Sequence, residues 1–339
     1  MKHPTLYLTQ RSERQQQSAL AAAPAGLDIT IRRDAARSEV LSLLPGAEFL
    51  ISERAGVIDA EMIAAGRNLK LIQRLGAQSW DIDLDAAGRA GIPVCDRPLG
   101  SCQLVAEHMV LQLLATAKRV RELMQIVADA GDWGVAPRRC TEDYYVGNWS
   151  RRKNIGNLRQ STVGILGFGE IGGELARRLR PFGCALLYNK RTRLPAKAEA
   201  ALGMAYAERE ALLARSDFVC SLLPLSPETE QSVNGGFFAA MKRGSIFVHA
   251  GAGGVVDELA LIDALRSSRL AGAALDTYTY EPMRPDDPLL ALARDPLQNL
   301  VLTPSIAAGI LSVPGHPRAG DYENIVAILT GQPLTNRLV

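Results

Sequence analysis

The sequence predicts an α/β protein of two domains, each with a doubly wound parallel sheet. Three observations support this prediction. Short apolar runs alternate with helical patterns over the first third of the chain, the stretch Thr162 to Gly172 passes from a buried strand through a glycine-rich turn into a helix, and strand-like runs recur beyond it. At 339 residues the chain is too long for one compact core, so two domains are expected.

The composition is that of an ordinary globular protein. Apolar residues make up 47% of the chain, charged residues make up 22%, and the formal net charge is +2. This balance points to no nucleic-acid or membrane partner, so we expect small molecules or copies of the chain itself as partners. With no apolar stretch of signal-peptide or transmembrane length, we expect a cytoplasmic protein.

The cysteines and histidines form no metal-binding pattern. The five cysteines are scattered without a C-x-x-C pair, and the four histidines lack the spacing of metal ligands. We therefore expect reduced, mostly structural thiols and no bound metal.

The first domain is expected to use both ends of the chain. Strand-like runs occupy residues 6–9, 28–32, 48–52, 71–75 and 92–95. An apolar repeat at helical period then continues over 105–130 without Gly or Pro, which predicts one long helix at a hinge between domains. Residues 304–339 are expected to return across this hinge, so the predicted domains are 1–104 with 304–339, and 105–303.

Residues 131–160 are rich in Trp, Tyr, Arg and Gly and show no clear period. Such a segment suits an arm that packs on something outside its own domain. We therefore expect a homodimer in which this arm contacts the partner.

The glycine-rich turn has the spacing G-x-G-x-x-G at Gly167, Gly169 and Gly172. The first glycine permits a tight turn, the second lets the main chain approach a pyrophosphate, and the third lets a helix, expected at 174–182, pack closely on the strand. The pyrophosphate would sit on amides at the helix N-terminus, where Glu170 and Ile171 lie. A plain glycine-rich turn is the alternative.

The next strand, expected at 185–188, is followed by Asn189 where a chain that prefers NAD would have Asp or Glu. The chain continues with Lys190, Arg191, Thr192 and Arg193. Asn removes the repulsion that a carboxylate would offer to a 2′-phosphate, and the cations and hydroxyl can hold that phosphate through charge-assisted hydrogen bonds. NADP(H) is therefore the predicted cofactor, with a solvated basic loop as the alternative.

Further strand-like runs follow at 218–222, 245–249, 271–275 and 299–302, with helices expected at 236–241 and 256–266. Together with the glycine motif, they predict a complete dinucleotide-binding domain of the Rossmann type.

Short motifs are spaced along most of the chain. They include Gly76-Ala77 with Asp83, Val105-Ala106-Glu107-His108, Leu223-Pro224 with Thr229, Gly253-Gly254-Val255-Val256-Asp257, Gly272 to Asp276, Glu281-Pro282 and Glu323-Asn324-Ile325. Taken in order, they resemble the D-isomer-specific 2-hydroxyacid dehydrogenase family. The resemblance implies a flavodoxin-like substrate domain formed by both chain ends, an NAD(P)-binding Rossmann domain between them, and a cleft where the two meet. It also implies cofactor contacts by Val105, Leu223, Pro224, Thr229, Ala250 and Asp276.

The resemblance further implies three catalytic groups. An Arg binds the carboxylate of the substrate, a His protonates the carbonyl oxygen, and a Glu hydrogen-bonds the His. The Glu corresponds to Glu281, which without its His could be only a structural acceptor. The Arg position is Ala252 and the His position is Ser305, and the flanking motifs align without gaps. Two of the three catalytic groups are therefore absent.

Other residues could supply the missing proton. His249, Tyr278, Tyr280 and His316 lie in segments that end at the implied cleft, each with a purely structural role as the alternative. Arg54, Arg74 and Arg97 follow or end strands of the first domain, and they could bind an acidic substrate or serve the surface and the domain interface.

The implied substrate loop is unusual too, because Ala77 is followed by Gln78, Ser79 and Trp80. Trp80 would narrow the mouth of the cleft and offer a flat apolar face, or else simply fill the core.

Three functions follow from these residues. The first is an NADPH-dependent oxidoreductase that acts on a carbonyl, hydroxy-acid or imine substrate other than a plain 2-oxoacid. The second is a catalytically degenerate NADP(H)-binding sensor or interaction protein. The third is a dehydrogenase whose Arg and His were removed by engineering or by substitution.

Overall fold

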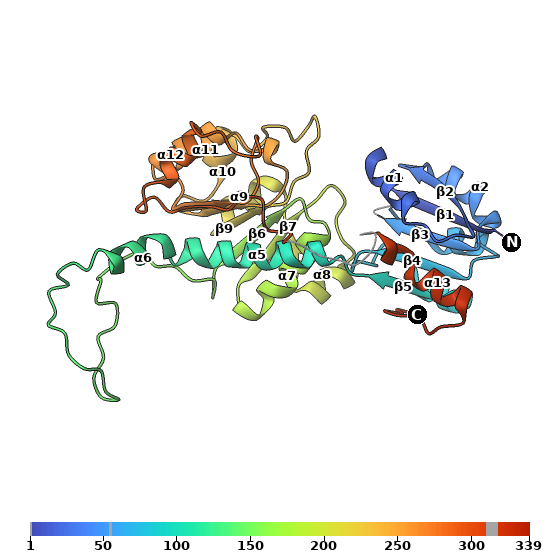
Figure 1. Ribbon diagram of the computed structural model, residues 1–339, viewed down its shortest axis with the longest axis horizontal. Helices are drawn as coiled ribbons and strands as arrows, with labels where there is room; N and C mark the ends of the chain where they lie inside the picture. Colours follow the sequence, from blue (N-terminus) through green and yellow to red (C-terminus); the bar gives the residue numbers. More distant parts are fainter. Residues whose placement is uncertain (1, 54–55, 310–317) are drawn as a thin grey trace. The chain divides into compact units, whose positions relative to one another are not determined.

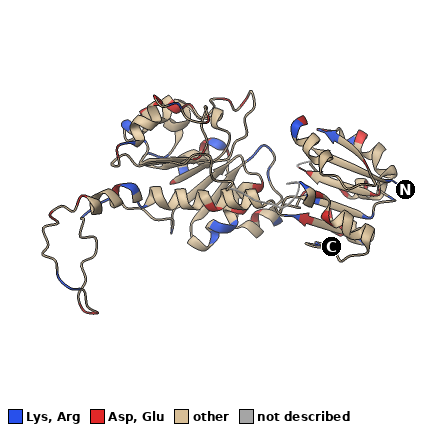
Figure 2. Cartoon of the chain, viewed as in Figure 1, with Lys and Arg blue, Asp and Glu red and all other residues tan. Residues whose placement is uncertain are grey.

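The computed structural model describes residues 2–53, 56–309 and 318–339, and the chain divides into two compact units (Figure 1). Unit 1 comprises residues 1–101 and 310–339, and unit 2 comprises residues 102–309. Positive and negative side chains are interspersed over both units (Figure 2), as the small net charge predicts.

Unit 1 contains a five-stranded parallel sheet in the order β2-β1-β3-β4-β5. Its strands are β1 (His3–Thr9), β2 (Leu27–Arg33), β3 (Phe49–Glu53), β4 (Leu71–Leu75) and β5 (Val94–Arg97). Its helices are α1 (Glu13–Ala21), α2 (Arg37–Leu43), α3 (Ala60–Ala65), α4 (Leu84–Arg89) and α13 (Glu323–Thr330). Each of the five strands overlaps a predicted one, which confirms the alternating pattern seen in the sequence.

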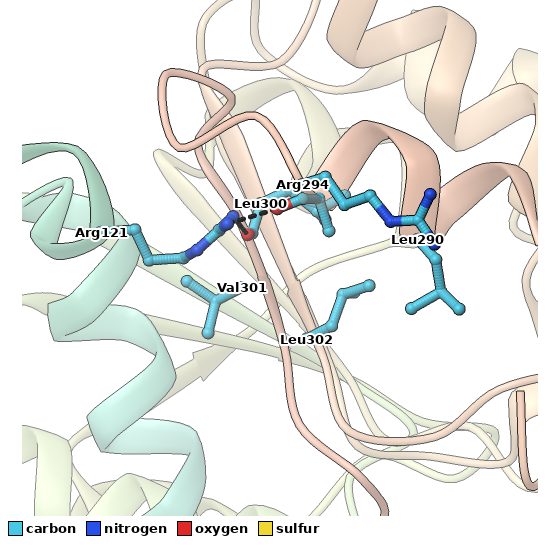
Figure 3. A pocket seen from close by; sticks show the side chains of 7 residues that line it. Arg121, Leu290, Arg294, Leu300, Val301 and Leu302 are labelled. Carbon is cyan, nitrogen blue, oxygen red and sulfur yellow. Dashed lines mark hydrogen bonds between the residues drawn. The ribbon is translucent and has the colours of Figure 1, made fainter. Parts of the chain in front are cut away.

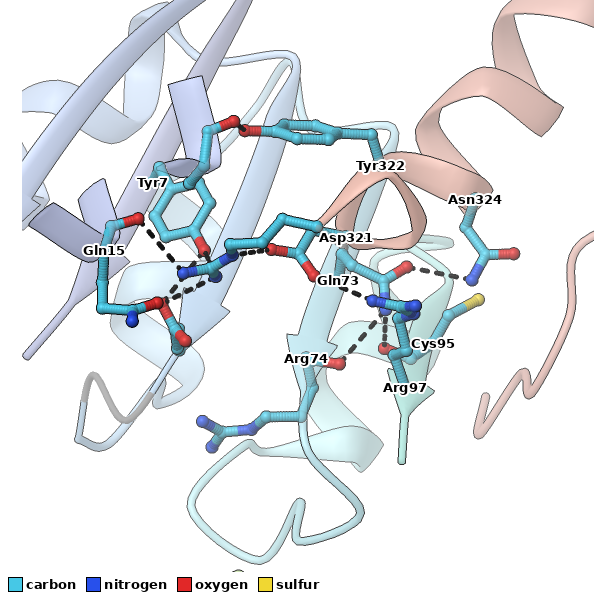
Figure 4. Close-up of polar contacts among 12 residues, drawn as sticks. Tyr7, Gln15, Gln73, Arg74, Cys95, Arg97, Asp321, Tyr322 and Asn324 are labelled. Atoms are coloured by element: carbon cyan, nitrogen blue, oxygen red, sulfur yellow. Dashed lines mark hydrogen bonds and ion pairs between the residues drawn. The ribbon is translucent and has the colours of Figure 1, made fainter. Parts of the chain in front are cut away.

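The C-terminal segment is held on this sheet by buried polar contacts (Figure 4). Asn324 donates a hydrogen bond of 2.9 Å to the side chain of Gln73, and the Tyr322 hydroxyl donates one of 2.7 Å to the Ala19 carbonyl. The buried carboxylate of Asp321 pairs with Arg97 at 2.8 Å. Because buried polar groups are costly to leave unpaired, these contacts specify where the returning chain lies.

Unit 2 contains a seven-stranded parallel sheet in the order β12-β11-β10-β9-β6-β7-β8. Its strands are β6 (Thr162–Leu166), β7 (Ala185–Asn189), β8 (Met204–Tyr206), β9 (Phe218–Ser221), β10 (Ile246–His249), β11 (Gly272–Leu275) and β12 (Leu300–Leu302). Its helices include α7 (Glu170–Leu179), α8 (Ala196–Leu202), α9 (Arg209–Arg215), α10 (Gly235–Ala240), α11 (Glu258–Arg266) and α12 (Pro288–Ala293). All the strands predicted here are confirmed, and the three-residue β8 is an additional one.

The single helix expected over 105–130 is wrong. Two helices occupy this region, α5 (Gly100–Ala117) and α6 (Val120–Ala128). The break occurs at Arg119, whose φ of 52° lies in the left-handed region and whose guanidinium bonds Glu122 and the Leu297 carbonyl. The tertiary contacts of the Arg119 side chain therefore interrupt the helix, although the sequence pattern continues through this position.

Arg121, two residues further along, covers an edge of the sheet. Its guanidinium donates to the main-chain carbonyls of Leu300 and Ala293 at the wall of a pocket of about 330 Å³ (Figure 3). Because β12 is an edge strand, occupying the Leu300 carbonyl blocks pairing with a foreign strand.

The helix predicted at 174–182 is also displaced in the structure. Helix α7 begins at Glu170, and residues 180–182 form a separate 3₁₀ turn with Pro181 near its start. The helix starts earlier because extended Gly169 serves as its N-cap, so the glycine turn leads directly into the first helical turn.

Candidate functional site

The glycine-rich turn lies at the carboxyl end of β6, and its glycines serve different purposes. Gly167 has a φ of +74°, and a Cβ there would lie 2.7 Å from main-chain atoms of Leu222. A Cβ on Gly172 would lie 2.8 Å from the Phe168 ring. These two glycines are therefore required by the packing of the turn itself.

Gly169 differs from the other two glycines. A Cβ at this position would lie 3.9 Å from its nearest neighbour, and the extended backbone requires no glycine. The space beside Gly169 lies at the N-terminus of α7, where the helix dipole favours an anion. The turn is thus a cradle into which a dinucleotide pyrophosphate fits.

The loop after β7 is built around Glu199 on α8. This carboxylate accepts bonds of 2.9 and 3.0 Å from Arg193 and one of 2.8 Å from the Tyr188 hydroxyl, and burial with this bond raises the pKa of Tyr188 to about 12. The Asn189 amide donates to the Ala207 carbonyl at 2.9 Å. Arg193 is therefore committed to the protein, whereas Arg191 and Thr192 are exposed on the loop.

The loops after β9 and β10 lie alongside the glycine turn. The Ala252 amide donates to the Leu223 carbonyl at 3.0 Å, and the Ala250 amide donates to the Ser221 carbonyl at 3.2 Å. Thr229 closes its own loop through a 2.6 Å bond to the Pro224 carbonyl. Four predicted cofactor contacts therefore lie together at the carboxyl edge of the sheet, where open α/β sheets bind ligands. They are Leu223, Pro224, Thr229 and Ala250.

A pocket of about 420 Å³ lies at this edge and contains three of the positions identified from the sequence, Ala252, Tyr278 and Glu281. It is lined by Leu225, Gly251, Ala252, Gly253, Gly254, Thr277, Tyr278, Thr279 and Glu281. A Cβ on Gly253 would overlap the Tyr278 carbonyl, so this glycine lets the Ala252 turn close against the Tyr278 segment. Ala252 and Glu281 therefore share one hollow, as the family pattern implies for the Arg and Glu positions.

The Tyr278 hydroxyl is poorly placed to act as a general acid. Its hydroxyl donates to the main-chain carbonyls of Thr303 at 2.7 Å and Leu275 at 3.1 Å, and burial raises its pKa above the ordinary value. Its amide donates to the exposed Glu281 carboxylate at 3.0 Å. These contacts support a structural role for Tyr278 and leave Glu281 as the ionisable group at the pocket surface.

His249 is fully buried at the end of β10. Its Nε2 lies 3.2 Å from the Ala252 carbonyl, and its Nδ1 has no hydrogen-bond partner of good geometry among the described residues, although the Ser221 main chain lies near. Burial lowers the pKa of His249 to about 4. A neutral imidazole that donates to Ala252 supports the turn at the pocket and is poorly suited to act as an acid near neutral pH.

The buried state of His249 predicts a pH dependence of stability. The unfolded chain takes up this proton near the ordinary histidine pKa of 6.5, and the folded protein does so only near 4. The free energy of unfolding should therefore fall as the pH is lowered from 6.5 to 4, by up to about 3 kcal/mol from this group. Denaturant titrations of His249→Gln should show a shallower fall over this range. Identical slopes in the two proteins would contradict the prediction.

Ser305 follows β12 in a loop held by Asp276. Ser305 is exposed and has a φ of 53°. The buried Asp276 carboxylate accepts the Thr303 hydroxyl at 2.6 Å and the amides of Ile306 at 3.1 Å and Ala307 at 2.8 Å. Asp276, predicted as a cofactor contact, thus positions the loop that carries Ser305.

Helix α5 adds two residues that sequence reasoning left without a role. His108 Nε2 lies 3.0 Å from the Thr303 hydroxyl and 3.5 Å from Asp276, and Gln112 donates to the same hydroxyl at 3.3 Å. His108 ends the Val105 motif of the hinge helix, and its i,i+4 spacing to Gln112 was the available signal. Val105 itself is buried one turn earlier.

The predicted substrate-loop residues Ala77, Gln78, Ser79 and Trp80 lie in unit 1, after β4. Gln78 is buried and the other three are partly buried. Arg74 is buried nearby, where it pairs with Asp81 and donates to the Ser52 hydroxyl at 3.0 Å. Arg74 and Arg97 are therefore engaged within unit 1, and Arg54 and His316 lie outside the described residues.

Across residues 2–53, 56–309 and 318–339, no group of three His, Cys, Asp or Glu side chains could hold a metal ion. No helix in the same part of the chain is long and apolar enough to cross a membrane.

Comparisons with known proteins agree with this geometry. Residues 110–307 match the family model of the D-isomer specific 2-hydroxyacid dehydrogenase, NAD binding domain. D-3-phosphoglycerate dehydrogenase of Archaeoglobus fulgidus is 33% identical over 312 residues, which cover 92% of this chain and 55% of that protein. Glyoxylate reductase of Korarchaeum cryptofilum is 32% identical over 294 residues, which cover 86% of this chain and 83% of that protein.

The structural comparison gives the same grouping. A Granulicella formate dehydrogenase has a TM-score of 0.56 at 27% identity, over 93% of this chain and 80% of that one. The chain spans about half the length of the phosphoglycerate dehydrogenases that it matches, at 55% and 52% of two of them.

Proposed function

This chain belongs to the D-isomer specific 2-hydroxyacid dehydrogenase family, and from this premise we propose that it is an NADP(H)-dependent oxidoreductase whose substrate is a carbonyl, hydroxy-acid or imine compound other than a plain 2-oxoacid. When bound, the nicotinamide supplies or accepts a hydride. The observation that carries the proposal is a glycine-rich cradle at Gly167 to Gly172 together with a pocket lined by Ala252, at the position where the family resemblance implies an Arg.

Different parts of unit 2 would bind the cofactor and the substrate. The cradle and the α7 N-terminus would hold the pyrophosphate, and the exposed loop after Asn189 would meet the ribose. The pocket between Ala252 and Glu281 would receive the substrate, with His249 and Asp276 holding the two loops that border it. The test is to mix the protein with NADPH and a panel of oxoacids, aldehydes and imines and to follow NADPH absorbance. Oxidation of NADPH by none of them would favour the alternative, a non-enzymatic NADP(H)-binding protein.

We expect NADPH to bind more tightly than NADH. Arg191 and Thr192 are exposed after β7, and the Asn189 position carries no carboxylate to repel a 2′-phosphate. Arg191→Ala should weaken NADPH by about tenfold to a hundredfold and leave NADH nearly unchanged, because only NADPH carries the phosphate. Titration of Trp fluorescence measures both constants. Lys197→Ala, an exposed cation on α8, is the matched control, and equal wild-type affinities for the two cofactors would refute the assignment.

A homodimer is the proposed assembly. Helices α5 and α6 expose the apolar side chains of Leu111, Met124 and Val127, which are 58%, 67% and 58% accessible. In the adjoining arm, Trp133 and Trp149 pack with their ring centroids 4.6 Å apart. An exposed apolar face of this kind is typical of an interface.

Light scattering at micromolar concentration should give the mass of a dimer. The double variant Met124→Glu with Val127→Glu should give a monomer, because it places charge on the apolar face of α6. Leu259→Glu, at an apolar side chain of 65% exposure on α11, should remain dimeric. A monomer mass for the unmodified protein would rule out the assembly.

A further inference from the structure

The pocket beside Ala252 carries one formal charge among its nine lining residues, and that charge is negative. It belongs to Glu281, an exposed carboxylate that accepts the Tyr278 amide at 3.0 Å. The side chain of Thr277, also on the wall, donates inward to the Gly251 carbonyl at 2.8 Å. Glu281 is thus the charged group that the wall offers to a ligand.

The segments behind the wall add to this negative potential. Glu258 accepts the Thr279 amide at 2.9 Å, and burial raises the pKa of its carboxyl above the ordinary range. The pKa of Tyr278 is raised mainly by burial. It is raised further by the negative charges of three nearby carboxylates, those of Asp276, Glu281 and Glu258. A ligand anion would be repelled here, whereas a ligand cation would be attracted and would keep Glu258 ionised.

We infer that the reducible group of the substrate is a cationic C=N bond, that is, a protonated imine, held with its nitrogen beside Glu281. This inference rests on the proposed function and narrows it to one substrate class. Glu281 supplies the negative charge that attracts the iminium. Ala252 is small and neutral, whereas an Arg at that position would repel the iminium.

The chemistry of this class accounts for both missing catalytic groups. Hydride from NADPH forms the new C–H bond on the imine carbon while the C=N π pair moves onto nitrogen as a lone pair, and NADPH becomes NADP⁺. The product is a neutral amine, so no proton is transferred in that step, and the amine later takes one from water. A carbonyl would instead leave an alkoxide, whose protonation requires an acid such as the His replaced by Ser305. An iminium thus needs neither a carboxylate-binding Arg nor a His.

Binding of stable probes tests the inference without turnover. Pyrrolidine, protonated at neutral pH, should give saturation-transfer NMR signals with the NADP⁺-loaded protein, and glyoxylate should give none. Glu281→Gln keeps an acceptor for the Tyr278 amide but removes the charge, so it should weaken pyrrolidine by about tenfold or more. Glu210→Gln, an exposed carboxylate on α9, is the matched control and should bind pyrrolidine as the unmodified protein does.

Turnover gives a second measurement. The cyclic imine 1-pyrroline should be reduced with NADPH, and Ala252→Arg should slow that reaction while improving the binding of glyoxylate. Pyrrolidine binding that is absent, or that Glu281→Gln leaves unchanged, would overturn the inference, and reduction of a neutral aldehyde in the same protein would show that the proposed function survives it. Failure to bind NADPH at all would refute the proposed function itself.

Discussion

Glyoxylate, hydroxypyruvate and pyruvate should be turned over at least about a thousandfold more slowly than by relatives that keep the Arg and the His. Loss of a general acid costs about 10² to 10⁴ in rate, and loss of charge-assisted bonds to a carboxylate costs roughly another tenfold to a hundredfold. Cofactor binding should be normal, because neither Ala252 nor Ser305 belongs to the glycine cradle. Steady-state assays with saturating NADPH measure the effect.

Restoring the two groups should be strongly non-additive. Ala252→Arg alone should do little, since protonation would still be missing, whereas Ala252→Arg with Ser305→His should recover measurable activity beside Glu281. The second change is compatible with the backbone, because His tolerates the left-handed conformation that Ser305 adopts at a φ of 53°. Robust reduction of any of the three acids by the unmodified protein would overturn this prediction and would mean that another residue already serves as the acid.

The glycine cradle predicts the second large effect, and its glycines should separate folding from binding. Gly167→Ala should both destabilise the protein and lower NADPH affinity by more than about a hundredfold, because a Cβ at a φ of +74° would lie 2.7 Å from the main chain of Leu222. Gly169→Ala should lower the melting temperature by no more than about 2 to 4 °C, through the poorer N-cap, since its Cβ would have 3.9 Å of clearance. It should nevertheless bind NADPH at least about tenfold more weakly.

Thermal unfolding and fluorescence titration together measure these two variants. The matched control is Gly235→Ala at the start of α10, where a Cβ would meet nothing within 4 Å, and it should change neither property. Wild-type affinity in Gly169→Ala would mean that the pyrophosphate does not approach this glycine.

Local patterns predicted the elements well where one force dominated. Buried parallel strands such as β11 (Gly272–Leu275) are continuous runs of apolar residues, so their position followed from composition alone. The helix pattern over 105–130 failed because periodicity reports an amphipathic face and not the tertiary bonds of Arg119 that break it. The start of α7 was misplaced for a related reason, since glycines at 172 and 173 lower helix propensity while the turn and the sheet still impose a helix there.

The sequence by itself determined the family, the two parallel sheets and the glycine-rich turn, because each of these follows from residue identity and spacing. Only the tertiary structure decided how the candidate groups are used. His249 and Tyr278 are titratable in sequence, but burial and bonds to main-chain carbonyls make them supports for the pocket. Asp276, His108 and Thr303 meet although 195 residues separate the last two, and no local pattern encodes such a contact. Protonation and hydrogen bonding depend on what surrounds a side chain, and those surroundings exist only once the chain has folded.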